Sequence, residues 1–418
     1  MYDTYHLLEE SKVNCRVCSR MNIPIIDFGP MPIANDFILD IKKDTFRFQM
    51  ATSFCEHCSL FQLDNQPRPE LMFHDHYPFF TGLSTAMTRH FGEMVELHLK
   101  DSKKLLSELF VVEIGSNDGT LLEFVKNLGI RHLGIDPSPN VVESSWKKGV
   151  SAEVGFFGEN FGLDVAKRHG KADVIFGANV ICHIPDILDF AKGIKEFLAE
   201  DGQFIFEDPY IGSMLTKTSY DQIYDEHVYI FGATSVRKIF ANVDLELVDA
   251  LSQETHGGSM RYVLMHKGKS KISERLKSIL QKEADEGYDK PDVYRSFAMK
   301  CEERRIEFTT LLKRLKSEGK NVGGYAATSK STTVLNFCSI GPDLIQFISD
   351  STKEKQGRYS PGSHIPIISQ EEMRMNPPDY LVLFGWNHEK EILAKEKKLT
   401  ANGVKWVRFV PKIEILDI

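Results

Sequence analysis

The sequence predicts an α/β protein with three folded units: a small cysteine-bearing N-terminal unit, a central Rossmann-like sheet and a second Rossmann-like α/β unit at the C-terminus. Strand-like and helix-like segments alternate over residues 85–265 and again over 320–418. Such alternation is typical of doubly wound, mostly parallel sheets. Two C-x2-C pairs set the N-terminal segment apart. We expect domains at 11–75, 76–268 and 321–418, with a helical connector at 269–320.

Length and composition narrow the classes of function. A chain of 418 residues can bury two or three separate cores, which suffices for a self-contained monomer. The net charge of -8 argues against a nucleic-acid or anionic-membrane partner. No apolar run approaches the roughly 18 residues of a membrane span, and Met1–Asn14 is too polar for a secretory signal. Seven cysteines, four of them in two pairs, favour a reducing cytoplasmic location over a disulfide framework.

The N-terminal cysteines predict a metal site. Cys15, Cys18, Cys55 and Cys58 form two knuckles that supply four thiolates for tetrahedral zinc. Four protein ligands leave no open position, so we expect the zinc to be structural. His57 is an alternative ligand, and four unmetallated thiols are the other interpretation. Short ribbon strands are expected at Ile23–Gly29 and Thr45–Gln49.

One turn in the central unit predicts a nucleotide-type cofactor. A β-branched strand, Phe110–Ile114, leads into an E-x-G-x-N-D-G turn, and Asp136 ends the next apolar run. Glycines allow close backbone approach, and an acid after the second strand accepts ribose hydroxyls. The turn lacks G-x-G-x-x-G, which favours S-adenosylmethionine (SAM) over NAD; a merely structural turn is the alternative. The candidate cofactor-binding residues are Glu113, Gly115, Asn117, Asp118, Gly119, Asp136 and Asn179.

The remaining elements complete the predicted sheets. Ligands bind beyond the carboxyl ends of parallel strands, so Gly115–Gly119, Asp136, Gly177–His183 and Glu207–Tyr210 should surround one crevice. Gly287 and Pro291 should separate two connector helices. Further central strands are expected at His132–Ile135, Asp173–Phe176 and Gln203–Phe206, and C-terminal strands at Phe347–Asp350, Tyr380–Phe384 and Val404–Val410. The buried connector stripe should be Phe297, Cys301, Phe308, Leu312 and Leu315.

Several polar clusters could carry chemistry. Glu226 and His227 stand in a polar and aromatic run, where an imidazole can act as general base; an acidic surface loop is the alternative. His183 should line the sheet mouth or cap a helix. The aromatic segment His74–Phe80 suits either a lid, with Tyr77 offering a hydroxyl, or interdomain packing. In the C-terminal unit, Lys330 and Ser331 follow a small-residue loop that suits either a phosphate or a structural turn.

The motifs taken in order resemble one enzyme family, the SAM-dependent sugar 3-C-methyltransferases of deoxysugar biosynthesis. The resemblance covers nearly the whole chain, including the paired knuckles. The motifs that carry it are H-x-x-Y-P at His74–Pro78, V-E-I-G-x-N-D-G at Val111–Gly119, C-H-I-P at Cys182–Pro185, F-E-D-P-Y at Phe206–Tyr210, D-Q-I-Y-D-E-H at Asp221–His227, H-G-G-x-x-R-Y at His256–Tyr262, G-Y-A-A-T-S-K at Gly324–Lys330, K-Q-G-R-x-S-P-G-x-H-I-P at Lys355–Pro366 and W-N-H at Trp386–His388.

This resemblance implies a mechanism on a nucleotide-linked 4-keto-6-deoxyhexose. His227 would remove the C3 proton to give an enolate, which accepts the methyl group of SAM with inversion at C3. The last domain would hold the nucleotide diphosphate through Lys330, Ser331 and Arg358. Other residues near the sugar, some donating to the enolate oxygen, would be Tyr77, Asn179, His183, Tyr224 and Glu226.

Two departures and two alternatives accompany the resemblance. Ala326 replaces a frequent glycine in the C-terminal turn, and Ser116 stands where cysteine is frequent. A SAM-dependent O- or N-methyltransferase acting on a nucleotide sugar would need no adjacent ketone. A non-catalytic zinc-ribbon interaction module would not bind SAM, and the intact turn and D-E-H segment argue against it.

Overall fold

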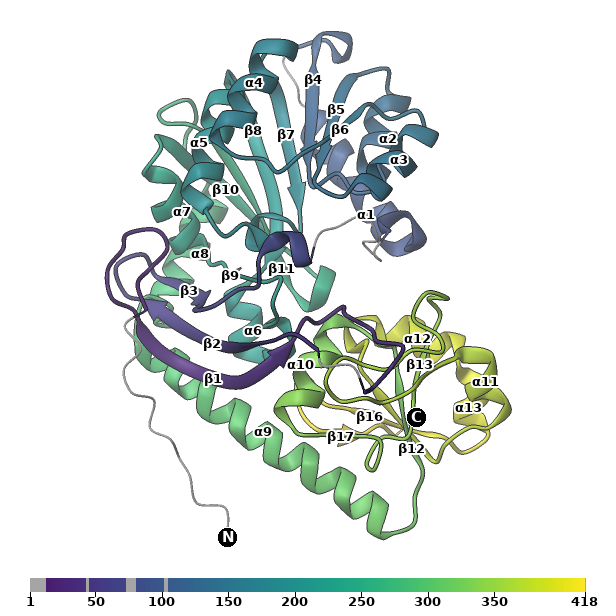
Figure 1. Ribbon diagram of the computed structural model, residues 1–418. Coiled ribbons are helices and arrows are strands. Elements are labelled where there is room, and N and C mark those ends of the chain that lie inside the picture. Colours follow the sequence, from purple (N-terminus) through teal and green to yellow (C-terminus); the bar gives the residue numbers. More distant parts are fainter. Residues whose placement is uncertain (1–12, 43–44, 73–79, 101–103, 418) are drawn as a thin grey trace.

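A computed structural model describes residues 13–42, 45–72, 80–100 and 104–417 (Figure 1). Its N-terminal sheet is antiparallel, with the order β1-β2-β3-β9. The fourth strand, β9, comes from the central part of the chain and follows directly on the segment that contains His227. The N-terminal unit is therefore joined to the predicted catalytic loop by a strand ladder. The bounds are β1 (Ile23–Pro32), β2 (Arg47–Cys55), β3 (Leu60–Leu63) and β9 (Tyr229–Ile230).

The central sheet has the order β10-β11-β8-β7-β4-β5-β6. Its strands run parallel except for β11, which is antiparallel to both of its neighbours. Helices cover both faces: Val111 packs in a core with α1 and α2, whereas Val112 packs in a core with α4, α5 and α7. The predicted doubly wound fold is confirmed. The strands are β4 (Phe110–Ile114), β5 (Arg131–Asp136), β6 (Ala152–Val154), β7 (Ala172–Ala178), β8 (Leu198–Pro209), β10 (Leu245–Gln253) and β11 (Ser259–His266). The helices are α1 (Thr85–Leu99), α2 (Thr120–Asn127), α3 (Pro139–Lys147), α4 (Glu159–His169), α5 (Ile187–Phe197), α6 (Ile211–Lys217) and α7 (Ala233–Ala241).

The C-terminal sheet, of order β14-β13-β12-β15-β16-β17, is parallel up to its antiparallel edge strand β17. It confirms the second α/β unit. Its strands are β12 (Val322–Tyr325), β13 (Ile348–Asp350), β14 (Ile367–Ser369), β15 (Tyr380–Leu383), β16 (Lys405–Arg408) and β17 (Glu414–Ile415). Its helices are α10 (Ser329–Phe337), α11 (Gln370–Met375), α12 (Glu389–Lys395) and α13 (Lys397–Ala401).

Two helices form the connector, α8 (Glu274–Asp285) and the long α9 (Pro291–Ser317). The predicted stripe, including Phe297, Phe308 and Leu312, is buried. In Figure 1, α9 runs below both the N-terminal and the C-terminal sheets, and one hydrophobic core contains residues of all three elements. The outer units are thus packed together through α9. Short 3-10 helices are η1 (Pro69–Leu71), η2 (Thr81–Leu83), η3 (Leu106–Glu108), η4 (Ile181–His183), η5 (Tyr220–Gln222), η6 (Thr255–Gly257) and η7 (Trp386–His388).

Two remaining expectations concern the membrane and the aromatic segment. Among the helices of the described residues, none has the length and apolar character needed to cross a bilayer. The segment 73–79, and with it Tyr77, lies outside the described residues.

Candidate active site

The turn after β4 is shaped for close approach by a ligand. Gly115, Asn117 and Gly119 all have left-handed backbone conformations, with φ of 69°, 49° and 75°. A Cβ at Gly115 would meet Cγ2 of Val180 at 2.1 Å, so a side chain there is sterically excluded. The turn therefore needs glycine at this position, as the sequence pattern predicted.

Carboxylates surround this turn. Asp136, at the end of β5, accepts backbone N–H bonds from Asn117 and Ser138, both 2.9 Å long. Asp118 is paired with Lys148 at 2.9 Å. Glu113 is buried, and its Oε2 accepts no hydrogen bond from the described part of the chain. Burial, together with the charges of Asp118 and Asp136, raises the pKa of Glu113.

These carboxylates fit a ligand that carries N–H and O–H donors. A buried acceptor without a partner is costly, and a donor from a ligand would satisfy it. The oxygens of Asp136 keep lone pairs beyond those used by the backbone, so they can still accept a ribose hydroxyl. SAM carries ribose hydroxyls and an ammonium group, so Glu113 and Asp136 suit it.

His227 is held as a neutral base. It is buried, and its Nδ1 lies 2.6 Å from the carbonyl oxygen of Gln222. That oxygen can only accept, so the ring proton is on Nδ1 and the Nε2 lone pair is free of it. The hydroxyl of Tyr224 donates to Nε2 at 2.7 Å. The ring of His183 stacks on the imidazole with centroids 5.3 Å apart.

Burial sets the charge state of this histidine pair. It lowers the pKa of His227 well below its usual value, and the neighbouring His183 lowers it further. The pKa of His183 falls to about 4, again because the ring is buried. Both rings are therefore neutral near pH 7, and His227 offers a lone pair to a proton donor.

Glu226 is hydrogen-bonded to a loop of the N-terminal unit. Its Oε1 accepts a 2.7 Å bond from the amide of Asn35. The other side of that amide, Oδ1, accepts from the hydroxyl of Ser329 at the start of α10. The adjacent Asp225 accepts the backbone N–H of Ala34 at 3.0 Å. One loop thus ties the D-E-H segment to both outer units.

A histidine outside the predicted set completes the neighbourhood. His256, in η6 at the tip of the β10–β11 hairpin, lies with its Nε2 2.8 Å from the amide nitrogen of Asn179. Its carbonyl oxygen accepts from Gln222 at 2.5 Å and from Lys330 at 3.3 Å. The H-G-G triplet, with its two glycines after a histidine, was the sequence signal for this turn.

The three candidate diphosphate-binding residues of the C-terminal unit have different contacts in the structure. Lys330 reaches the site, since it contacts His256 and lies 5.5 Å from the ring centre of Trp386. The hydroxyl of Ser331 is engaged in a capping box with Thr328 at the start of α10. Arg358 donates to the carbonyl of Phe37 at 3.0 Å. Of the three, Lys330 is the one that these contacts join to His256.

Sequence reasoning also missed two lysines here. Lys355 donates to the carbonyl of Ala327, at the loop before α10, at 2.8 Å. Lys217, at the end of α6, donates to Gly257 and lies 5.9 Å from the ring centre of Trp386. Both approach the loop or the hairpin tip across the fold; Lys355 begins the motif Lys355–Pro366, but neither lysine was assigned to the site from the sequence.

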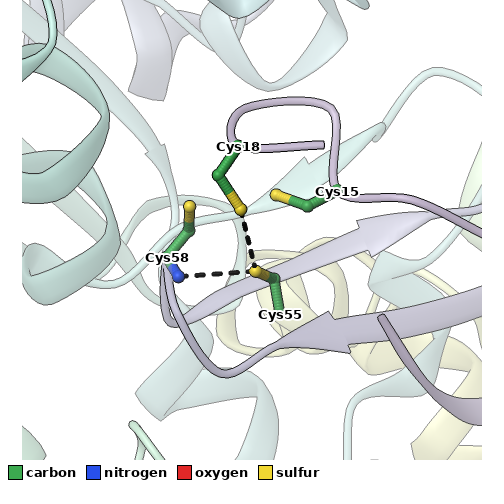
Figure 2. A group of neighbouring side chains, drawn as sticks. All are labelled: Cys15, Cys18, Cys55 and Cys58. Atoms are coloured by element: carbon green, nitrogen blue, oxygen red, sulfur yellow. Dashed lines mark hydrogen bonds between the residues drawn. The ribbon is translucent and has the colours of Figure 1, made fainter. Parts of the chain in front are cut away.

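The four predicted cysteine ligands converge on one point. Their sulfurs lie within 4.8 Å of one another, and Figure 2 shows the two knuckles facing each other. Sγ of Cys18 and Sγ of Cys55 are 3.6 Å apart. Sulfurs bound at ~2.3 Å to one tetrahedral zinc ion would be separated by about 3.8 Å. The cluster therefore fits zinc, and among the described residues it consists of the four cysteines without His57.

Comparison with known proteins assigns a family to each of the three units. Family models match at residues 15–73 (zinc binding domain), 88–250 (methyltransferase domain) and 254–411 (C-methyltransferase C-terminal domain). C-methyltransferase NovU of Streptomyces niveus is 31% identical over 408 residues, 96% of each chain.

Solved structures resemble part of the chain at low similarity. Magnesium protoporphyrin IX methyltransferase (ChlM) from Synechocystis PCC 6803 with bound SAH shares 14% identity, with 43% of this chain and 83% of that chain covered and a TM-score of 0.35. The CcbJ methyltransferase from Streptomyces caelestis shares 11% identity over 43% of this chain and 90% of its own, with a TM-score of 0.33.

Proposed function

We propose that this chain, which belongs to the family of SAM-dependent C-methyltransferases, methylates C3 of a nucleotide-linked 4-keto-6-deoxyhexose. The observation that carries the proposal is His227. A buried, neutral imidazole with its proton fixed on Nδ1 presents a lone pair close to the SAM-binding edge of the sheet. Carbon methylation needs such a base, because a carbon nucleophile must first lose a proton.

The proposed reaction uses one cofactor, SAM, and the fold uses one metal, zinc. SAM is the methyl donor, and the cysteine cluster binds zinc. Glu113, Asp136 and the turn from Gly115 to Gly119 would hold SAM. When bound, SAM supplies an electrophilic methyl group, which the enolate carbon accepts with inversion. The four cysteine sulfurs would fill a tetrahedral coordination shell and leave no open position, so the zinc would have a structural role.

Proton removal is the work of His227. The C4 carbonyl acidifies the C3 proton, and Nε2 takes it while the C–H electrons form the C3–C4 double bond and the carbonyl electrons move onto the C4 oxygen. Burial disfavours the imidazolium in the free protein. The developing negative charge on the sugar supplies the missing counter-charge, so the basicity of His227 rises as the substrate binds.

The surrounding residues would orient the substrate. The hydroxyl of Tyr224 fixes the imidazole until a substrate proton replaces it. His183 packs on the same ring, while Glu226 is placed by Asn35 to accept from a sugar hydroxyl. We assign the nucleotide diphosphate to Lys330, at the first turn of α10, where helix backbone amides favour an anion.

The test uses a nucleotide-linked 4-keto-6-deoxyhexose in deuterated water, followed by mass spectrometry and NMR. We expect enzyme-dependent deuterium uptake at C3, and a C3 methyl group once SAM is added. A methyl group on oxygen or nitrogen would replace this proposal with an O- or N-methyltransferase. Neither exchange nor transfer with several such sugars would refute the substrate assignment.

A variant separates the base from general damage. His227→Ala should slow both exchange and transfer by about 10²–10⁴-fold, the usual contribution of a general base, while the Kd for SAM stays unchanged. Glu226→Gln is the matched control on the neighbouring residue, and we expect it to raise the sugar KM more than it lowers the rate of exchange. Equal exchange rates in His227→Ala and wild type would move the base elsewhere.

A further inference from the structure

His256 occupies an unusual place in the fold. It has a left-handed backbone, with φ of 52°, although it is not glycine. The two residues that follow it, Gly257 and Gly258, also have positive φ, of 89° and 124°, but glycine adopts such values without the steric cost that a histidine pays. Side chains held at positive φ concentrate at functional sites, where the surroundings enforce them.

Three segments hold this histidine in position. The side chain of Asn179, from the loop after β7, contacts the ring, and its own backbone is also left-handed, with φ of 55°. Gln222 and Lys330 both donate to the backbone oxygen of His256. The preceding residue, Thr255, is anchored to the buried carboxylate of Glu207 at 2.6 Å.

The contact with Asn179 determines the tautomer. An amide nitrogen can only donate, so Nε2 of His256 accepts and the ring proton is on Nδ1. This Nδ1 makes no hydrogen bond within the part of the chain that the structure describes. The atom is not completely buried, so a ligand can reach it. Burial lowers the pKa of His256 to about 3, so the ring is a neutral donor.

Two short connections link this donor to His227 and to the SAM turn. Gln222 accepts from Nδ1 of His227 through its carbonyl and donates to His256 through its side chain. Asn179 contacts His256 and precedes Val180, the residue that packs on Gly115 of the SAM turn. His256 is therefore linked to His227 through one residue, Gln222, and to the SAM turn through two, Asn179 and Val180.

We propose that Nδ1–H of His256 donates a hydrogen bond to the C4 oxygen of the sugar and stabilises the enolate. The inference rests on the proposed function. As His227 takes the C3 proton, the carbonyl electrons collect on the C4 oxygen, and the donor of His256 faces the growing charge without giving up its proton. When C3 bonds to the methyl carbon, those electrons return and the hydrogen bond weakens. A neutral imidazole suits this role because it donates without attracting the proton that the base must remove.

Other candidate donors have different contacts in the free protein. Tyr224 directs its hydroxyl proton to His227 until the substrate proton takes that place, and the ring of His183 stacks on the imidazole of His227. Lys330 would bring a full positive charge, but it is bound to the His256 carbonyl and is assigned to the nucleotide. His256 differs from them in that its proton is fixed on Nδ1 and has no hydrogen-bond partner among the described residues.

The test replaces the ring without disturbing the backbone. Glycine tolerates φ of 52°, so His256→Gly removes only the imidazole. We expect C3 deuterium exchange and methyl transfer to fall about 10²–10³-fold, the usual effect of losing one oxyanion donor. Added imidazole should restore part of both rates, while the Kd for SAM remains that of wild type. His364→Gly is the matched control, since His364 is another half-buried histidine with φ of 57°, and it should change neither rate.

Three results would overturn the inference. The first is exchange in His256→Gly at the wild-type rate. The second is a loss that imidazole does not rescue and that is accompanied by weaker SAM binding, which would indicate a structural role. The third needs no substrate: histidine-selective ¹⁵N NMR, assigned by the signal missing from the variant, should find the Nδ1–H tautomer, and finding the proton on Nε2 would refute the donor. Because the NMR result does not depend on the sugar, failure of this inference is distinguishable from failure of the proposed substrate.

Discussion

Glu113 should strengthen SAM binding. In the SAM-free protein, the same residue should lower the free energy of unfolding. Its Oε2 is buried with no partner among the described residues, and two further carboxylates, Asp118 and Asp136, lie nearby. At a pH above the raised pKa of Glu113, the substitution Glu113→Gln removes one of three clustered negative charges. The free variant should therefore be more stable than wild type, by about 1 kcal/mol, because a buried charged acceptor loses its penalty.

The same change should weaken cofactor binding. A hydrogen bond from a ligand to a charged group contributes about 1.5–3 kcal/mol, which corresponds to about 10- to 150-fold in Kd. Titration calorimetry with SAM and with its demethylated product measures this loss. Glu123→Gln, on the adjoining helix and only half-buried, is the control and should leave Kd unchanged.

The pH dependence follows from the raised pKa of Glu113. The carboxylate binds the ligand, and a proton competes with it, so the SAM affinity of wild type should rise as pH increases toward the raised pKa. Glu113→Gln cannot titrate, so its affinity should lack this component. Unchanged SAM affinity in Glu113→Gln, with the same pH profile as wild type, would refute the reasoning.

The remaining predictions concern the metal, the nucleotide and the backbone. Cys15→Ser should lower both zinc content and soluble yield, measured by elemental analysis and thermal unfolding, because structural zinc contributes folding free energy; full stability without metal would contradict the assignment. Lys330→Met should raise the sugar-nucleotide KM and weaken its salt dependence, whereas Arg358→Ala should do so less, since Arg358 is bound to the N-terminal loop; a larger effect of Arg358→Ala would reverse the assignment. Ala326→Gly should stabilise the protein by about 1 kcal/mol in denaturant titrations, because Ala326 has φ of 73° and a left-handed alanine costs about 1–2 kcal/mol; a destabilised variant would show that the chain is not strained there.

Sequence reasoning succeeded where a short pattern determines the structure. The strand Phe110–Ile114 has the bounds that its apolar run predicted. The connector stripe is buried because its 3–4 spacing puts those side chains on one face of α9. The cysteine spacing likewise brought the four sulfurs together, since each knuckle is a local turn.

It failed where residues far apart in the chain meet. The strand β9 has two residues, too few for any periodic signal, so its place in the N-terminal sheet was not predicted. Asn35 and His256 reach the site across the fold, and nothing local marks them as neighbours of Glu226 or Asn179. T-x-x-S before a helix also fits a capping box, and the structure contains one between Thr328 and Ser331; the assignment of Ser331 to a phosphate stays a prediction.

The contacts of the N-terminal unit indicate that it supports His227, the proposed base. Strand β3 leads from the second knuckle to the ladder with β9, and β9 follows the loop that holds His227. From the same unit, Ala34 and Asn35 hold Asp225 and Glu226, and Asn35 also contacts Ser329 of α10. A zinc ion bound to the four cysteines would join the knuckle before β1 to the knuckle before β3. It would therefore hold in place strand β3, with which β9 pairs. Loss of the metal should therefore disturb the orientation of His227 before it disturbs the SAM turn, which is anchored separately through Asp136.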